Sequence, residues 1–308
     1  MGSYKFLMIF MSGFEILYGL IDLMIQPEVK TMDSFWLTMT SSRRSVLSLS
    51  VAYPLLLIWG GAFGIALASF GIHFVYRYFI ITGSKKWVTE NKGLWIWMSI
   101  PIASGFIYAF AIHFFWNLSP VMDAFVKEKL EISENVSASQ IIYFSSYPFK
   151  TIPKSPFIEL DWLQIYGVIF LCSSVSISFF TMIYFGVKTY SAMRNFQYTS
   201  SSTKNLQTQL FYSLVIQTII PVILIHFPTT LIYVSTFFDA AYEFYGKVVT
   251  VTIALFPAID PLPSLIIIKP YKQAIKNCFK KTLNVKGMSS VEASTRVTST
   301  IMSRPGNF

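Results

Sequence analysis

Three acidic residues stand inside long apolar runs, where a carboxyl group is costly. Glu15 and Asp22 are seven residues apart, so they share one face of a helix, two turns from each other. Each carboxylate costs about 2.5–3.5 kcal/mol near the centre of a membrane helix, so this face must look into a helix bundle. Glu15 and Asp22 therefore predict either an ion or proton relay or a structural polar network, and the sequence leaves both open.

The third acid, Asp260, lies among prolines in the run Pro257-Ala-Ile-Asp-Pro-Leu-Pro263. Three prolines within seven residues remove helix hydrogen bonds and prevent a straight helix. The pattern predicts a helix break at Asp260 and Pro261, which is either a hinge or a static kink.

Arg77 ends the second apolar run and has a tyrosine on each side, Tyr76 and Tyr78. An arginine at this place is either an anchor at the membrane surface, with the tyrosines in the aromatic belt, or a switch residue that grips neighbouring helices.

The sequence contains no motif typical of catalysis or metal binding. His73, His113 and His226 lie in three different apolar runs and form no HxxxH or HExxH pair. There is also no GxSxG, no glycine-rich phosphate loop and no Cys–His pairing, and two cysteines are too few for a disulfide framework. We expect a binder or a conduit that is not an enzyme and needs no metal or cofactor.

The composition indicates that the elements around these residues are membrane helices. Hydrophobic residues make up 54% of the 308-residue chain and charged residues only 13%, about half the usual share. This excludes most soluble proteins, disordered chains, coiled coils and nucleic-acid-binding domains. Six runs are long enough to cross a bilayer, at about 6–26, 53–76, 94–116, 163–187, 210–237 and 248–268. Because backbone polar groups find no partners in lipid and no run alternates in polarity, we predict an all-α membrane protein with a helical bundle over 1–268.

Charge predicts the orientation and the nature of the connecting segments. One side of the predicted membrane collects about twice as many Lys and Arg as the other, which places both termini in the cytosol. The long outer loop 117–161 carries two glycosylation sequons, at Asn117 and Asn135.

The segment after the last run predicts an amphipathic helix at the inner membrane surface, over 269–286. Cys278 within it is either a palmitoylation site or an unmodified thiol. The Ser- and Thr-rich tail 287–308 is predicted to be disordered.

Several blocks in a fixed order resemble the Str class of nematode serpentine chemoreceptors. They are Phe70-Gly-Ile-His-Phe-Val-Tyr-Arg-Tyr78, Leu206-Gln-Thr-Gln-Leu-Phe-Tyr212, Gln217-Thr-Ile-Ile-Pro221, Phe256-Pro-Ala-Ile-Asp-Pro261 and Tyr271-Lys-Gln-Ala-Ile275. The resemblance implies a rhodopsin-like G-protein-coupled receptor bundle, in which the six runs correspond to family helices two to seven, without the first.

The resemblance also implies a function and a place for several residues. The chain is expected to be an olfactory-type receptor in the ciliary plasma membrane of a sensory neuron, with a small-molecule odorant and a heterotrimeric G protein as partners. Tyr76-Arg77-Tyr78 takes the place of the arginine switch motif, and Asp260-Pro261 that of the hinge in the last helix. Lys204 lies in the loop expected to contact the G protein.

The ligand pocket is expected in the outer half of the bundle. The candidate lining residues are Tyr108, His113, Tyr166, His226 and Tyr233, although His226 is either at a cavity or hydrogen-bonded within the bundle. Two alternatives stay open: an ion- or proton-coupled transporter or channel that uses Glu15, Asp22 and Asp260, and a truncated receptor product that does not signal. The predicted partners also include the lipid bilayer but no nucleic acid, and a receptor dimer stays open.

Overall fold

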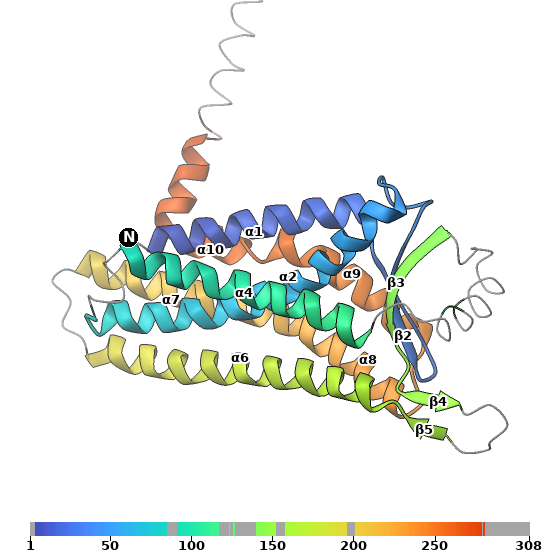
Figure 1. Ribbon diagram of the computed structural model, residues 1–308. Helices are drawn as coiled ribbons and strands as arrows, with labels where there is room; N and C mark the ends of the chain where they lie inside the picture. The colour runs from blue at the N-terminus through green and yellow to red at the C-terminus, as the bar shows by residue number, and fades with distance from the viewer. Residues whose placement is uncertain are drawn as a thin grey trace, which may run out of the picture.

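The computed structural model describes residues 4–84, 91–116, 123, 126, 140–151, 158–195, 201–278 and 280, and they form a bundle of long helices with strands at one end (Figure 1). Among these residues, six helical segments are long and apolar enough to cross a membrane. They are α1 (Tyr4–Ile25), α2 (Leu49–Ile81), α4 (Asn91–Phe115), α6 (Trp162–Asn195), the segment formed by α7 (Ser201–Pro221), η2 (Val222–His226) and α8 (Phe227–Phe237), and the segment formed by α9 (Glu243–Ile259) and α10 (Leu262–Ile267). The prediction of a helical membrane bundle is confirmed.

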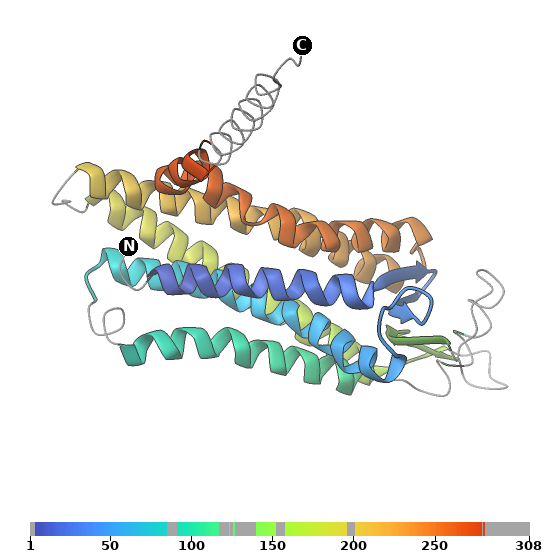
Figure 2. The same cartoon turned by 90° about the horizontal axis from the view of Figure 1, so that it is seen from above.

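Helix α2 runs through the middle of the bundle and packs against α1, α4 and α6 (Figures 1 and 2). Of its most apolar stretch, 67% is buried, whereas the value for α6 is 11%. The rest of α6 presents apolar side chains to the surroundings, as a helix in lipid does. Helix α2 therefore holds the position from which side chains can reach several other helices.

Glycines bring α2 and α4 close together. A Cβ atom on Gly61 would lie 2.7 Å from the carbonyl oxygen of Gly105, and one on Gly64 would lie 2.9 Å from the carbonyl oxygen of Ser104. Small residues are typical where membrane helices pack backbone to backbone.

Two of the membrane segments are not continuous α-helices. In η2 the Phe227 N–H donates to the Val222 carbonyl, five residues earlier, so the turn is a π-helix. The break expected from the prolines lies between α9 and α10, at Asp260 and Pro261.

A three-stranded antiparallel sheet closes one end of the bundle, and we did not predict it. Its strands are β1 (Glu28–Met32), β2 (Phe35–Ser41) and β3 (Ile141–Ser146), paired in the order β1-β2-β3, with Val29 opposite Thr38 and Trp36 opposite Ser146. All seven residues of β2 are buried, so the strand lacks the alternation of polarity that reveals a half-exposed strand. A separate hairpin pairs β4 (Phe149–Thr151) with β5 (Ile158–Leu160).

Strand β1 lies directly on the start of α9. The Val29 N–H donates to Oγ1 of Thr250 at 2.8 Å, the Thr31 hydroxyl donates to the Tyr242 carbonyl at 2.6 Å, and the Gly246 N–H donates to Oγ1 of Thr31 at 3.1 Å. A Cβ atom on Gly246 would lie 2.4 Å from the Val29 carbonyl oxygen, so only glycine permits this approach.

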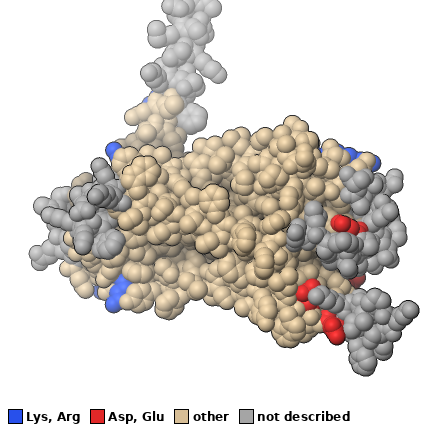
Figure 3. All heavy atoms as spheres, in the orientation of Figure 1, with Lys and Arg blue, Asp and Glu red and all other residues tan. Residues whose placement is uncertain are grey.

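Ion pairs connect residues at the sheet end of the bundle. Glu28 accepts from Arg44 at 2.8 Å and lies 3.6 Å from the ammonium group of Lys30. Burial lowers the pKa of Lys30, and the nearby Glu28 opposes that shift. Between the two ends, the described surface is almost free of charge (Figure 3).

The start of α1 and the helix that follows α10 lie at the same end of the bundle, opposite the sheet (Figures 1 and 2). That last helix covers residues 269–278 and 280. The sequons at Asn117 and Asn135, the end of the predicted amphipathic helix and the tail 287–308 lie outside the described residues.

Candidate functional site

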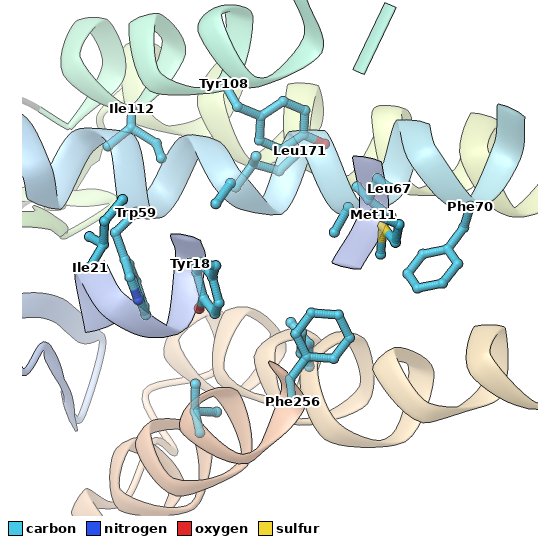
Figure 4. Close-up of a cluster of buried hydrophobic side chains, with 14 of the residues drawn as sticks. Met11, Tyr18, Ile21, Trp59, Leu67, Phe70, Tyr108, Ile112, Leu171 and Phe256 are labelled. Carbon is cyan, nitrogen blue, oxygen red and sulfur yellow. The ribbon is translucent and has the colours of Figure 1, made fainter. Parts of the chain in front are cut away.

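An apolar cavity of about 110 Å³ lies among the helices, directly beneath the sheet. All six membrane segments contribute to its wall, and the sheet supplies its roof. The wall includes Phe14, Tyr18, Trp59, Phe63, Ala66, Tyr108, Ile112, Leu171, Ile225, Thr229, Ile232, Tyr233 and Phe256, and the roof is Val29, Trp36, Thr38 and Phe144. Figure 4 shows how Trp59 of α2, Tyr18 of α1 and Phe256 of α9 approach one another from different helices.

Few polar groups face this cavity. The Tyr108 hydroxyl is hydrogen-bonded to the Ser174 hydroxyl of α6, and the Thr229 hydroxyl is bonded within its own helix, to the Ile225 carbonyl at 2.6 Å. The ring of Tyr233 lies against Trp36 of the roof, with the ring centroids 5.6 Å apart. An apolar molecule with one or two hydrogen-bonding groups matches such a lining.

The volume limits the size of that molecule. A dry cavity of about 150 Å³ in another protein holds benzene, whereas drug-sized ligands need about 300–1,000 Å³. At about 110 Å³, the cavity in this conformation suits a molecule of at most benzene size.

Of the five predicted ligand residues, the structure brings Tyr108 and Tyr233 to the cavity. His113 is exposed on the outer surface of α4, where its Nδ1 lies 3.0 Å from the Tyr53 hydroxyl, and Tyr166 is 57% exposed on α6. Both helices are apolar on every face, so the sequence did not reveal which face looks inward.

His226 is buried one layer behind the cavity. Its ring lies edge-on between Phe63 and Phe179, with centroids 5.1 Å from each. Phe63 lines the cavity and His226 does not, so His226 touches a ligand only through Phe63.

The two acids of α1 have different partners and do not form one network. Asp22 accepts a hydrogen bond from the Trp59 indole N–H at 2.9 Å. Glu15, two turns away, lines a second cavity together with Pro261 of the helix break. Because Trp59 lines the cavity, Asp22 acts as its anchor to α1.

At the other end of α2, the guanidinium group of Arg77 is buried and joins three helices. Its Nη2 donates to both the backbone carbonyl and the side-chain oxygen of Gln207 on α7, the latter at 3.1 Å. It also lies over the ring of Tyr4 on α1, 5.4 Å from the centroid. Arg77 is 1% exposed, so in this conformation it is covered from the aqueous side and is not a simple surface anchor.

The neighbours of Arg77 pack in different directions. Tyr76 is fully buried between Tyr4 and Trp97, whereas Tyr78 packs on Phe185 of α6. Lys204 is exposed near the start of α7.

The break at Asp260 is tied to α7. Nε2 of Gln217 donates to the Asp260 carbonyl at 3.1 Å, and the Ser264 hydroxyl donates to Oε1 of Gln217 at 3.1 Å. The Ser213 and Ser264 hydroxyls are 3.0 Å apart. One glutamine of α7 is thus hydrogen-bonded to residues on both sides of the break.

Sequence reasoning missed Gln207, Gln217, Trp59 and Tyr4 as site residues. Gln217 carries a signal that could have found it, because an amide within the apolar run 210–237 needs a partner in the bundle, whereas Gln207 lies before that run. Nothing in the sequence indicates which helix supplies that partner.

No group of three or more His, Cys, Asp or Glu within the described ranges is arranged to hold a metal ion. Cys278, the predicted palmitoylation site, is exposed on the helix after α10.

Comparisons with known proteins show the family of this chain. A sequence model of the family described as serpentine type 7TM GPCR chemoreceptor Str matches residues 1–276. The G-protein coupled receptor str-217 of Caenorhabditis elegans is 28% identical over 304 residues, which are 94% of this chain and 86% of the relative. The serpentine receptor class r-10 of the same organism is 27% identical over 305 residues, 95% of this chain and 87% of the relative. No solved structure is significantly similar.

Members of this family are receptors and not enzymes, with ligands and G proteins as their general partners. The chain is therefore a multi-pass membrane protein that belongs to the Str family of serpentine seven-transmembrane chemoreceptors.

Proposed function

We propose that this chain is an olfactory-type receptor that binds a small, volatile, mostly apolar odorant in the cavity beneath the sheet and activates a heterotrimeric G protein at the opposite end. The observation that carries the proposal is the course of α2. This one helix lines the cavity with Trp59, Phe63 and Ala66 and carries Arg77 about 27 Å beyond Trp59 along its axis. If the ligand displaces α2, the displacement therefore also moves Arg77, the proposed switch residue.

A ligand changes the population of two helix arrangements only through its different affinity for each. In the arrangement described here, Gln207 and Tyr4 cover Arg77. Activation moves α7 away from α2, which uncovers the guanidinium group for the G protein. The break at Asp260 and Pro261 serves as the hinge, and the exposed Lys204 adds positive charge to the docking surface.

We place the receptor in the plasma membrane of a sensory cilium with both termini in the cytosol. Two features support this orientation. The start of α1 lies at the end of the bundle that holds Arg77, and the helix 269–278 lies at the same end (Figure 1). The excess of Lys and Arg in the segments of that end follows the positive-inside rule. The sensory location follows from membership in a chemoreceptor family.

The test is expression of the full chain in cells that carry a G protein and a calcium reporter. A panel of volatile molecules of increasing size is applied, and we expect responses that disappear above roughly the size of benzene. Responses that persist when the G protein is absent would contradict coupling and would favour a channel or transporter. Terminal epitope tags should be reachable by antibody only after the cells are permeabilised, and labelling of intact cells would contradict the orientation.

A further inference from the structure

The sheet covers the ligand cavity with two layers of side chains. Trp36 and Thr38 of β2 line the cavity, so the alternate residues of this strand face the opposite way. That outer face is covered as well, because it belongs to a second apolar cluster of buried residues: Phe35, Leu37, Met39, Val126, Ile141 and Tyr143. Water at this end of the bundle is therefore separated from the cavity by the sheet and by the cluster on top of it.

Hydrogen bonds attach the sheet to three helices. Besides the bonds from β1 to α9, the Thr40 hydroxyl of β2 donates to the Ile25 carbonyl at the end of α1. The Ser146 hydroxyl of β3 donates to Oε1 of Gln164 on α6 at 3.0 Å. A ligand that entered through the sheet would have to break bonds to these helices and open the apolar cluster above them.

The interface between α6 and α8 is held much more weakly. The backbone of α6 packs mainly against α2 and α4, and that of α8 mainly against α9. Within the described parts of the chain, no hydrogen bond, ion pair or ring contact joins α6 to α8. Only the packing of side chains closes the bundle between these two helices.

Two aromatic contacts mark the ends of this weak interface. At one end, the ring of Phe179 on α6 lies 5.1 Å from that of His226, just before α8. At the other end, Phe237 of α8 lies 6.2 Å from Phe149 of β4. His226 and Phe237 are about 16 Å apart along the helix axis. We call the part of the α6–α8 interface between these two contacts the window.

The window lies at the level of the ligand cavity. On α6, Cys172 and Val175 come seven and four residues before Phe179, so they lie on the same side of the helix. Cys172 is exposed, whereas its neighbour Leu171 lines the cavity. On α8, Tyr233 lines the cavity and is only partly buried. The wall between lipid and cavity is therefore one side chain thick at the window.

Other helix interfaces around the cavity have specific contacts that the window lacks. The Tyr108 hydroxyl of α4 is hydrogen-bonded to the Ser174 hydroxyl of α6, and glycines bring α2 and α4 together. Between α1 and α9, the ring of Tyr18 lies edge-on to Phe256, with the centroids 6.5 Å apart. Passage at the window requires only that side chains move aside.

We propose that the odorant enters the ligand cavity from the lipid bilayer, through the window between α6 and α8, and that Tyr233 is the side chain that moves aside. A small apolar molecule collects in the hydrocarbon core of a membrane, because the removal of apolar surface from water is favourable. Helices α6 and α8 belong to segments that cross this core. The inference rests on the proposed function in taking this cavity as the odorant site.

Thiol labelling measures access to the cavity without an odorant or a G protein. In the full chain with Cys172→Ser and Cys278→Ser, an added Ala66→Cys is the single cysteine and lies in the cavity wall. Methyl methanethiosulfonate, a small uncharged reagent, transfers its methylthio group to this thiol, forms a disulfide and releases methanesulfinate. Mass spectrometry follows the rate of this reaction in lipid nanodiscs.

A large side chain in the window should slow the labelling. We expect Val175→Trp to lower the rate about tenfold, which corresponds to about 1.4 kcal/mol in the barrier to entry. Ile177→Trp is the matched control, because Ile177 is 67% exposed on another side of the same helix, and it should leave the rate unchanged. Cys172→Phe, in place of Cys172→Ser, fills the same window and serves as a second variant if Val175→Trp does not fold.

Thr31→Val tests the route through the sheet. It removes the two hydrogen bonds by which Thr31 holds β1 on the start of α9, and we expect it to leave the rate unchanged. Faster labelling in Thr31→Val, or an unchanged rate in both window variants, would overturn the proposal. A chain that labels as expected but gives no odorant response would contradict the proposed function and leave the lipid route standing.

Discussion

Arg77 of α2 donates from a single guanidinium nitrogen to both oxygen atoms of Gln207 on α7, which joins two helices that are far apart in sequence. A hydrogen bond to a charged group contributes about 1.5–3 kcal/mol, so the side-chain bond alone biases the helix arrangement roughly tenfold or more. Gln207→Ala should therefore raise signalling without ligand, and Gln207→Glu should lower it, because a carboxylate holds the guanidinium group more tightly. Second-messenger levels in unstimulated cells provide the measurement. Thr208→Ala, on the same turn, is the control, and equal effects of all three changes would contradict the role of Gln207.

Substitution of Arg77 itself should lower signalling, in contrast to Gln207→Ala, and the effect concerns the receptor with ligand bound. We expect Arg77→Ala to abolish ligand-evoked signalling while the protein still reaches the cell surface, because the G protein loses the charge that activation uncovers. Surface labelling and a second-messenger assay on the same cells separate the two effects. A normal response in this variant would refute the role of Arg77.

Filling the ligand cavity should weaken the response without harming the fold. Ala66 lines the cavity, and a leucine side chain there occupies most of its 110 Å³. We expect the potency of an active odorant to fall at least tenfold, which is about 1.4 kcal/mol. Ala103→Leu adds the same atoms on the exposed face of α4 and should leave potency unchanged. An equal loss in both variants would show that the cavity is not where the odorant binds.

The contact between α2 and α4 should tolerate no side chain at Gly61. Because the added Cβ meets the backbone of Gly105 at 2.7 Å, the two helices must move apart, which typically costs about 1–3 kcal/mol. Gly61→Ala should lower the melting temperature and the amount of protein at the cell surface. Gly13→Ala, which meets no atom within 4 Å, is the control. Equal melting temperatures for the two variants would argue against this packing.

Glu28 should matter more to the sheet than its partner Arg44 does. The Lys30 side chain is 12% exposed, and without Glu28 its charge loses the carboxylate 3.6 Å away, at a cost of about 1 kcal/mol or more. Arg44 is half exposed, so Arg44→Gln should cost less. Because burial holds the pKa of Lys30 below its usual value, Lys30 becomes neutral as the pH rises through that lowered pKa. The loss of melting temperature in Glu28→Gln should therefore shrink toward alkaline pH, and a loss independent of pH would contradict this account.

The sequence was sufficient for the membrane helices because long apolar runs have few explanations. It was also sufficient for the break at Asp260, because proline acts locally. The sheet was not predictable in the same way, since β2 is buried on all sides and the pattern of an uninterrupted apolar strand is too short to separate from a helix.

The candidate site was only partly predictable, for a geometric reason. Tyr108 and Tyr166 are both tyrosines in apolar helices, yet one lines the cavity and the other faces outward. Which face of such a helix looks inward is decided by its neighbours, here by the glycines that draw α4 onto α2. The approach of Glu15 to the helix break at Pro261 likewise depends on how segments far apart in the chain pack together.

The π-turn of η2 determines the direction in which the side chains of α8 point. It inserts one residue more than an α-helix would use, and each residue of an α-helix turns the chain by about 100°. If the same residues wound as a regular α-helix, Thr229, Ile232 and Tyr233 would be rotated by up to about 100° away from their present direction. A change of winding at η2, without any change in the aromatic side chains themselves, is thus enough to alter which side chains of α8 face the cavity.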